Sequence, residues 1–371
     1  MPATALECAR CATPYDASVL QGRCGCGGTL LARYDLAAVA RQARGPGGAS
    51  GLWAYRDLLP VTGEPVSLGE PETPLLPLPR LSDRLGVEVW VKDDGGLPGG
   101  TFKARGAAVG VTRARELGAT AVVLPSAGNA GGAWALYGAR AGLPVTVTMA
   151  RTAPVMNQRE VTLAGATLEL VAGTLADAGR RAKELAAASG AFLAATFGEP
   201  YRVEGKKTAW LETFDQLGRL PGTIVFPVGG GVGLVAADKA AVEVRALGWY
   251  GGEPPALVGV QAADCAPIVA AYDAGAAAAE PWPGTPATSA AGLRVTAPGE
   301  SDLVLRCVRD SGGTMLAVAE ADITAAVAEV ARTEGVWLSP EGAAAVAALP
   351  RLRNPRGPVV VYNTASGPKY A

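Results

Sequence analysis

Residues 223–247 read TIVFPVGGGVGLVAADKAAVEVRAL and join an apolar run to a glycine-rich turn and an alanine-rich stretch. The apolar run predicts a buried strand over Ile224–Val228, and the spacing after the turn predicts a helix over Gly233–Leu247. A strand, a tight turn and a helix in this order form one βα unit, the building block of a parallel sheet. This stretch therefore predicts an α/β fold.

The same alternation of valine-rich runs and alanine-rich stretches occupies most of the chain from about residue 85 onward. Further strands are expected at Val87–Lys92, Ala121–Pro125, Val145–Met149, Thr167–Val171, Phe192–Ala195, Leu257–Gln261, Met315–Val318 and Val359–Tyr362. Further helices are expected at Phe102–Leu117, Gly131–Ala141, Asn157–Ala164, Leu175–Ala188, Val203–Leu217, Ala321–Thr333 and Glu341–Leu349. Because nine strands are too many for a single hydrophobic core, we expect two α/β lobes with a cleft between them.

The composition restricts the classes of function. The 371 residues include 33 Lys and Arg, 34 Asp and Glu and no His, which gives a formal net charge of −1. Without a basic excess, neither nucleic acid nor an anionic membrane is expected as a partner. Without histidine, Ser-His-Asp and Cys-His catalysis and every His-ligated metal centre are excluded.

The sequence offers no segment typical of membrane insertion or secretion. Its longest uncharged stretch, Leu117–Ala139, is interrupted by Pro125, Asn129 and several glycines, which would leave backbone groups unpaired in lipid. Met1–Arg10 lacks the basic and apolar regions of a secretory signal. We therefore expect a cytoplasmic location.

Four of the six cysteines lie close together, as Cys8-Ala-Arg-Cys11 and Cys24-Gly-Cys26. In a cytosolic chain, four thiolates in one short segment more often hold zinc than form disulfides. We predict a structural zinc ion on Cys8, Cys11, Cys24 and Cys26; reduced cysteines in a mobile arm are the alternative. Cys265 and Cys307 are expected to be small core residues.

Three features fall where predicted strands end, the edge at which open parallel sheets bind ligands. The sharpest is Pro227-Val-Gly-Gly-Gly-Val-Gly233, whose glycines allow the backbone to close around an anion with N–H groups pointing at it. A plain glycine-rich turn is the alternative. Gly231-Val-Gly233-Leu-Val-Ala236 also loosely fits a dinucleotide motif, but Leu257–Gln261 ends without the acidic residue that holds a ribose. A phosphate monoester therefore fits better than a pyrophosphate.

The other two features carry side chains suited to one cofactor. In Ser126-Ala-Gly-Asn129 the backbone N–H groups suit a carboxylate, and the Asn129 amide can bond a phenolic oxygen. In Gly100-Thr-Phe-Lys103-Ala-Arg-Gly106 the helix start and Arg105 help to depress the lysine pKa, as an imine-forming amine requires. An ordinary turn and a solvated lysine are the alternatives. Taken together, the three features predict a site for pyridoxal phosphate.

At these residues the chain resembles the fold-type-II, tryptophan-synthase-β-like pyridoxal phosphate enzymes, and most of all the threonine synthase family. The similar segments are Cys8–Cys26 with Tyr34-Asp35, Leu68-Gly-Glu-Pro-Glu-Thr-Pro-Leu75, Thr101–Gly106, Ser126–Asn129, Glu199–Thr208, Gly229–Gly233 and Asn363–Lys369. The resemblance implies a two-domain enzyme with parallel-type sheets and a homodimeric assembly. We expect residues 1–33 as a zinc-ribbon-like segment, 34–103 with 205–371 as the large cofactor-binding domain, and 104–204 as a small domain carrying the asparagine loop.

The resemblance also implies roles for individual residues. Lys103 would bind the cofactor covalently and move protons as the catalytic residue. The other cofactor-binding residues would be Phe102, Asn129, Gly229, Gly230, Gly231, Val232, Gly233 and Thr364. Asn129 would face the ring oxygen, the glycine loop would hold the phosphate, and Thr364 would bond the pyridine nitrogen. The substrate-binding residues would be Thr101, Ser126, Ala127, Gly128 and Arg202.

The implied activity is that of a lyase that converts O-phospho-L-homoserine and water to L-threonine and phosphate. Ala127 stands where many members of the family have threonine, and Phe197 replaces a serine that some members aim at the substrate phosphate, so the leaving group can differ. The alternative is therefore a dehydratase or β-replacing enzyme acting on serine, threonine, O-phosphoserine or a pathway-specific amino acid. A non-catalytic scaffold or zinc-ribbon binding module is the third hypothesis.

Overall fold

The structure is a computed structural model that describes residues 4–40 and 51–371. The chain forms two compact units. The first contains Met1–Pro71 and Lys103–Thr208, and the second contains Glu72–Phe102 and Ala209–Ala371. The boundary therefore falls between two neighbouring residues of the lysine motif, Phe102 and Lys103.

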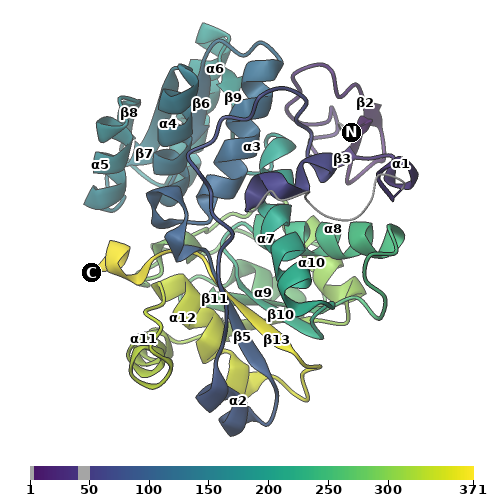
Figure 1. The fold of residues 1–371 in the computed structure, drawn as a ribbon. Coiled ribbons are helices and arrows are strands. Elements are labelled where there is room, and N and C mark those ends of the chain that lie inside the picture. Colours follow the sequence, from purple (N-terminus) through teal and green to yellow (C-terminus); the bar gives the residue numbers. More distant parts are fainter. Residues whose placement is uncertain (1–3, 41–50) are drawn as a thin grey trace. The chain divides into compact units, whose positions relative to one another are not determined.

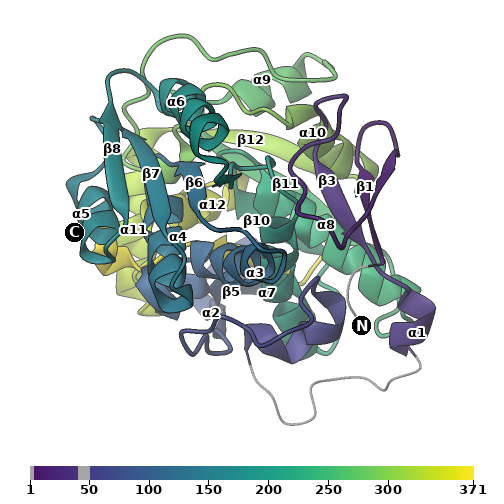
Figure 2. The ribbon, with the colours of Figure 1, turned by 90° about the horizontal axis from the view of Figure 1, so that it is seen from above.

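The first unit is built on a parallel four-stranded sheet with the order β8-β7-β6-β9. Its strands are β6 (Val122–Pro125), β7 (Val145–Ala150), β8 (Thr167–Val171) and β9 (Phe192–Leu193). One face of the sheet is covered by α6 (Leu175–Ser189), and the helices on the other side are α3 (Lys103–Glu116), α4 (Asn129–Ala141) and α5 (Val155–Leu163) (Figures 1 and 2). The unit also contains residues 201–208 of α7 (Tyr201–Leu217).

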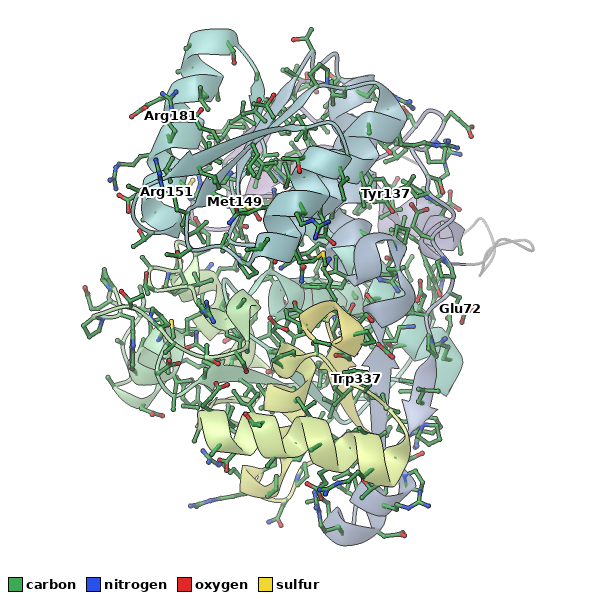
Figure 3. The ribbon with its side chains drawn as sticks, turned by 90° about the vertical axis from the view of Figure 1, so that its left-hand side faces the viewer. Glu72, Tyr137, Met149, Arg151, Arg181 and Trp337 are labelled. Atoms are coloured by element: carbon green, nitrogen blue, oxygen red, sulfur yellow. The ribbon has the colours of Figure 1, made fainter. Side chains whose placement is uncertain are left out.

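Local sequence explains where the helices of this unit begin and end. Thr174 caps α6 in a reciprocal capping box with Asp177, and Gly190 ends the helix in the left-handed conformation with φ 71°. Arg181 on the exposed face of α6, labelled in Figure 3, pairs with Glu169 of β8. The helix thus presents small buried residues to the sheet and charged residues to solvent.

A small antiparallel sheet of order β2-β1-β3 lies in the N-terminal part of the first unit. Its strands are β1 (Ala5–Cys8), β2 (Pro14–Tyr15) and β3 (Leu30–Arg33), followed by α1 (Leu36–Ala40) and the 3-10 helix η1 (Leu52–Leu58). The buried cluster around this sheet consists of Leu6, Cys8, Ala17, Cys24, Leu30 and Ala32. So few apolar residues make a very small core, which two of the predicted zinc ligands help to form.

The described residues between 34 and 71 belong to the first unit, whereas the sequence-based division placed them in the large domain. Buried hydrogen bonds explain this difference. Glu70 accepts from the Trp53 Nε1–H at 2.8 Å and from the hydroxyl of Tyr137, which Figure 3 labels on α4. The backbone N–H of Val66 donates to the Thr112 hydroxyl of α3 at 2.9 Å.

The second unit is built on a six-stranded sheet with the order β12-β11-β10-β13-β5-β4, parallel except for its last pair. The strands are β4 (Leu75–Pro77), β5 (Val89–Asp93), β10 (Thr223–Pro227), β11 (Ala256–Ala262), β12 (Thr314–Val318) and β13 (Val359–Asn363). The helices are α2 (Pro79–Leu85), α8 (Val232–Ala246), α9 (Pro267–Asp273), α10 (Ser301–Asp310), α11 (Glu320–Glu334) and α12 (Pro340–Ala347), beside the later part of α7. Valines of β5, β10, β11 and β13 pack with α11 and α12 in one buried cluster.

The pairing of β5 with β13 has the largest consequence for the predicted site. Val89–Asp93 lies in register with Val359–Asn363, so two segments that are far apart in the sequence become neighbours. The chain continues from β5 into the lysine motif and from β13 into Thr364. Both candidate segments therefore leave the sheet at the same edge.

The structure confirms the predicted α/β fold and its nine strands, although β9 is shorter than predicted. The strands and α-helices that were not predicted are β1 to β4, α1, α2, α9 and α10. In the part of the chain that the structure describes, no helix has the length and apolar character needed to cross a membrane.

Candidate functional site

The first part of the lysine motif, Gly100–Phe102, belongs to the second unit, where backbone pairing with the segment that follows β13 fixes it. The Phe102 N–H donates to the Thr364 carbonyl oxygen at 2.9 Å, and the Ser366 N–H donates to the Gly100 carbonyl oxygen at 2.9 Å. Thr101 and Ala365 form a β-bridge between these two bonds. The residue directly before Lys103 is thus bonded to Thr364, the residue predicted to face the cofactor ring.

An aromatic cluster connects this pairing to the glycine loop. The centre of the Phe102 ring lies 5.9 Å from the centre of the Phe226 ring and 5.8 Å from the centre of the Tyr362 ring. Both pairs are nearly edge to face. The rings of Phe226 and Tyr362 are 5.0 Å apart. Phe226 stands on β10 just before the glycine loop, and Tyr362 stands on β13 just before Thr364. Three of the predicted cofactor-binding segments therefore meet around one cluster within the second unit.

The glycine loop meets the geometric requirements of an anion site. Gly231 has φ 84°, a left-handed conformation that favours glycine, and α8 begins at the next residue. A Cβ at Gly229 would lie 2.2 Å from the Gly292 carbonyl oxygen, and one at Gly233 would lie 2.0 Å from the Phe226 ring. The first N–H groups of a helix have no acceptor within the helix, and in the described chain no side chain caps α8. These residues fit the phosphate of pyridoxal phosphate.

The asparagine loop lies in the first unit, between β6 and α4. The Ser126 hydroxyl accepts from the N–H groups of Gly128 at 3.1 Å and Gly131 at 2.9 Å, so it stabilises the loop itself. The Asn129 side-chain oxygen accepts from the Asn157 amide at 2.8 Å. Asn157, on α5, was not singled out from the sequence because the contact joins residues of different helices. It orients the Asn129 amide.

A cluster of charged side chains surrounds the start of α7. The Arg202 guanidinium is buried and donates to the Glu199 carboxylate, to the Ala194 carbonyl oxygen and, at 3.1 Å, to the Thr196 hydroxyl. It also lies 5.3 Å from the centre of the Trp134 ring. Arg202 was predicted to bind the substrate, and in this structure its guanidinium is bound by protein groups. Its role toward the substrate stays a prediction.

Lys206, one helical turn after Arg202, is buried and was not among the predicted site residues. Burial is the main cause that lowers the pKa of Lys206 well below its ordinary value of 10.5, and the charges of Lys103 and Arg202 lower it further. Glu199 acts in the opposite direction. Lys206 and Lys103 are therefore electrostatic neighbours within the first unit.

The cysteine segment brings all four predicted ligands together. The sulfur atoms of Cys8, Cys11, Cys24 and Cys26 lie within 4.8 Å of one another. The Cys8–Cys26 and Cys11–Cys24 sulfur pairs are both 3.5 Å apart. Four sulfurs bound tetrahedrally to zinc would be about 3.8 Å apart, given a Zn–S distance of about 2.3 Å. The donor set and its spacing therefore fit zinc.

Two further observations bear on metal binding by this segment: the space beside the Cys8 sulfur and the pKa values of the thiols. A Cβ at Gly28 would lie 2.8 Å from the Cys8 sulfur, so glycine keeps room for the sulfur cluster. Hydrogen bonds from the side chain and backbone of Thr13 lower the pKa of Cys11 to about 6, whereas hydrogen bonds with the other three cysteines raise the pKa of Cys26 to about 12. The thiolate is the form of cysteine that binds a metal.

The chain is similar to known pyridoxal-phosphate dependent enzymes and, among them, to threonine synthases. The chain matches the pyridoxal-phosphate dependent enzyme family over residues 66–364. It is 35% identical to the threonine synthase of Methanosarcina acetivorans over 352 residues, which are 94% of this chain and 86% of that protein. It is 33% identical to the threonine synthase of Methanocaldococcus jannaschii, over 93% of this chain and 87% of that protein.

Solved structures support the same fold. Threonine deaminase isoform 2 from Solanum lycopersicum is 25% identical, with a TM-score of 0.66 over 80% of this chain and 84% of that one. Maize serine racemase, 22% identical, has a TM-score of 0.69 over 80% of this chain and 88% of that one, a likeness of fold alone.

Proposed function

Because this chain belongs to the family of pyridoxal-phosphate dependent enzymes, and to its threonine synthase branch, we propose that it converts O-phospho-L-homoserine and water to L-threonine and phosphate. The observation that carries the proposal is the similarity to threonine synthases over nearly the whole chain. The homodimer and the cytoplasmic location stay predictions.

The structure supports the residue roles that belong to this proposal. Lys103 would bind the cofactor and move protons at the α and β carbons of the substrate. The N–H groups of Gly229–Gly233 would hold the cofactor phosphate, and Asn129, oriented by Asn157, would donate to the ring oxygen. The Thr364 hydroxyl would bond the ring nitrogen, on a backbone that the Phe102 N–H holds in place.

The cofactor, when bound, supplies an electron sink for carbanions next to the amino group of the substrate. A hydroxyl partner leaves the ring nitrogen mostly unprotonated, which suits elimination and replacement better than transamination. Ser126, Ala127 and Gly128 would lie against the substrate carboxylate, and Thr101 would line the same region. The Ser126 and Gly128 N–H groups donate within the protein, to the Thr148 carbonyl oxygen at 3.0 Å and to the Ser126 hydroxyl at 3.1 Å. We also propose a structural zinc ion on the four clustered cysteines.

The test is turnover by purified, cofactor-loaded protein supplied in turn with phosphohomoserine and phosphoserine. We expect threonine and phosphate in equal amounts from phosphohomoserine and little phosphate from phosphoserine. Lys103→Ala should abolish the activity, whereas Lys183→Ala, at an exposed lysine of α6, should not. Release of phosphate from phosphoserine alone would favour the β-replacing or dehydratase alternative, and no turnover of phosphohomoserine would remove the present proposal.

A further inference from the structure

The helix α5 buries a polar side chain and exposes several apolar ones. Asn157 is only 5% exposed, whereas Val155 and Leu163 are 70% and 82% exposed. A helix that serves packing alone shows the opposite pattern, with its apolar side chains toward the core and its polar ones toward solvent. The buried asparagine is therefore the informative feature of α5, and its burial needs a reason beyond packing.

Two glycines leave room for Asn157 and its neighbour Glu160 against α4. A Cβ at Gly128 would lie 3.1 Å from Asn157 Oδ1, and one at Gly132 would lie 2.6 Å from Glu160 Oε2. Gly128 directly precedes α4, and Gly132 stands in its first turn. Because Asn157 and Glu160 are three residues apart on α5, they lie on the same face of that helix. Both side chains thus pack beside the helix start that carries Asn129.

Hydrogen bonds link these side chains in series. The Asn157 Nδ2 group donates to Glu160 Oε2 at 3.2 Å and to Asn129 Oδ1 at 2.8 Å. The nitrogen of a side-chain amide carries two N–H donors, so it can make both bonds, whereas a carboxylate can only accept. Glu160 therefore requires the nitrogen end of the Asn157 amide to face it. That nitrogen in turn requires the oxygen end of the Asn129 amide.

We infer that Glu160 sets, through Asn157, which end of the Asn129 amide is presented to the cofactor. The inference rests on the proposed function, because it needs Asn129 to face the ring oxygen of pyridoxal phosphate. With the Asn129 oxygen turned toward Asn157, the NH2 group is the end that donates to the ring oxygen. A donor at that position favours the ionised form of the ring oxygen. Glu160 and Asn157 are thus positioning residues, which act through Asn129.

A double variant that reverses this polarity provides the test. In Asn157→Asp/Glu160→Gln, named the reversed pair, both side chains keep their shape and their combined charge, but the carboxylate now lies next to Asn129. The carboxylate accepts from the introduced glutamine amide and from the Asn129 NH2 group. The Asn129 oxygen then faces the ring oxygen, so that two acceptors oppose each other.

The measurements are the affinity and the absorbance of the bound cofactor, both taken without substrate. We expect the dissociation constant of pyridoxal phosphate for the reversed pair to rise about tenfold to a hundredfold, the usual effect of losing a hydrogen bond to a charged group. The long-wavelength absorbance band, which belongs to the ionised ring oxygen, should lose intensity to a band at shorter wavelength. A general effect on folding would not shift the balance between these two bands.

Three further variants make the result specific. Glu160→Gln alone should bind the cofactor about as tightly as the wild type, because glutamine can still present an oxygen to Asn157. Asn157→Ala removes the constraint without reversing it, so its loss of affinity should be smaller than that of the reversed pair. In an Asn129→Ala background the reversed pair should cause no further loss, because the amide on which it acts is absent.

Urea unfolding of the cofactor-free proteins shows whether each variant folds. A folded reversed pair with the cofactor affinity and absorbance of the wild type would overturn the inference, as would a loss that persists in the Asn129→Ala background. If the reversed pair does not fold, Asn157→Ala decides the matter. Its loss of affinity should disappear when Asn129 is also alanine, and an unchanged loss would overturn the inference.

The outcome is separate from the test of the proposed reaction. A wild type whose cofactor affinity is lowered by the reversed pair, but which does not convert phosphohomoserine, would remove the proposed substrate and leave the role of Glu160 standing. Threonine formation by the wild type, together with normal cofactor binding by the reversed pair, would have the opposite meaning.

Discussion

Gly233 is the residue at which one added methyl group should act on both packing and ligand binding. Its Cβ would lie 2.0 Å from the Phe226 ring, which itself contacts Phe102 of the lysine motif. We expect Gly233→Ala to lower the free energy of unfolding by about 1–3 kcal/mol, the usual effect of overpacking, and to weaken cofactor binding. Urea unfolding and a cofactor titration measure the two effects.

Gly179 provides the matched control for that substitution. It also lies inside a helix, α6, but a Cβ there would meet nothing within 4 Å. Gly179→Ala should therefore raise the free energy of unfolding by about 0.5–1 kcal/mol, because alanine favours the helix. Equal effects of the two substitutions would contradict the packing argument.

Lys206 should give the stability of the protein a distinct dependence on pH. The pKa of Lys206 is lowered in the folded state, so between its folded and unfolded pKa values the unfolded chain binds the extra proton. As pH falls below 10.5, the ordinary pKa of lysine, this residue therefore lowers the free energy of unfolding. Lys206→Met should be more stable than the wild type near neutral pH, and the gain should shrink as pH rises.

Denaturant unfolding of cofactor-free protein at several pH values measures this difference. Lys183→Met is the control, because its lysine is exposed and should give no comparable trend. A gain in stability that does not change with pH would indicate that only packing is altered at position 206.

At the scale of elements, the N-terminal antiparallel sheet should depend on its metal. Its core contains only a few apolar side chains, so the cross-link through four sulfurs should supply much of its stability. We expect Cys8→Ser to lose bound zinc and to increase amide hydrogen exchange in residues 4–33 more than elsewhere. Metal analysis and hydrogen-exchange mass spectrometry measure these effects.

The lone cysteines provide the control for the metal prediction. Cys265 is buried in the second unit, far along the sequence from the cluster. Cys265→Ala should keep the zinc content of the wild type. Wild-type protein purified without chelators and found free of zinc would contradict the assignment.

The elements that were predicted from the sequence are those with long, regular apolar patterns. Thr223–Pro227 is fully buried, as expected for a central parallel strand, and its neighbours follow the same rule. The three-residue β4 gives too short a pattern, and its antiparallel pairing with β5 depends on the tertiary fold. The helix Ser301–Asp310 does carry a helical signal, since Leu303, Val304, Cys307 and Val308 have helical spacing and are all buried.

The residues of the candidate site also differ in whether the sequence alone could identify them. Lys103, the glycine loop and Asn129 could be singled out because each follows a strand end and has a chemically suggestive neighbourhood. Asn157 and Lys206 could not, because their importance comes from contacts between helices. The engagement of Arg202 by Glu199 and the Ala194 carbonyl likewise depends on how the loop before α7 folds back.

At the scale of the whole molecule, cofactor binding should raise stability by mass action. A ligand that binds only the folded protein adds about 2.7 kcal/mol at a hundred times its dissociation constant. We expect pyridoxal phosphate to raise the melting temperature of the wild type and to raise that of Lys103→Ala much less. A calorimetric scan with and without cofactor measures both, and an equal rise in the two proteins would contradict covalent binding at Lys103.

The pairing of the segment around Phe102 with the segment around Thr364 also bears on when the protein can become active during its synthesis. A nascent chain still emerging from the ribosome lacks β13 until more than three hundred and fifty residues have been translated. Until then β5 has no partner on that side, and Phe102 has no Thr364 carbonyl to bond. Loading of the vitamin-derived cofactor should therefore be a post-translational event, and stalled chains that stop before residue 359 should remain colourless.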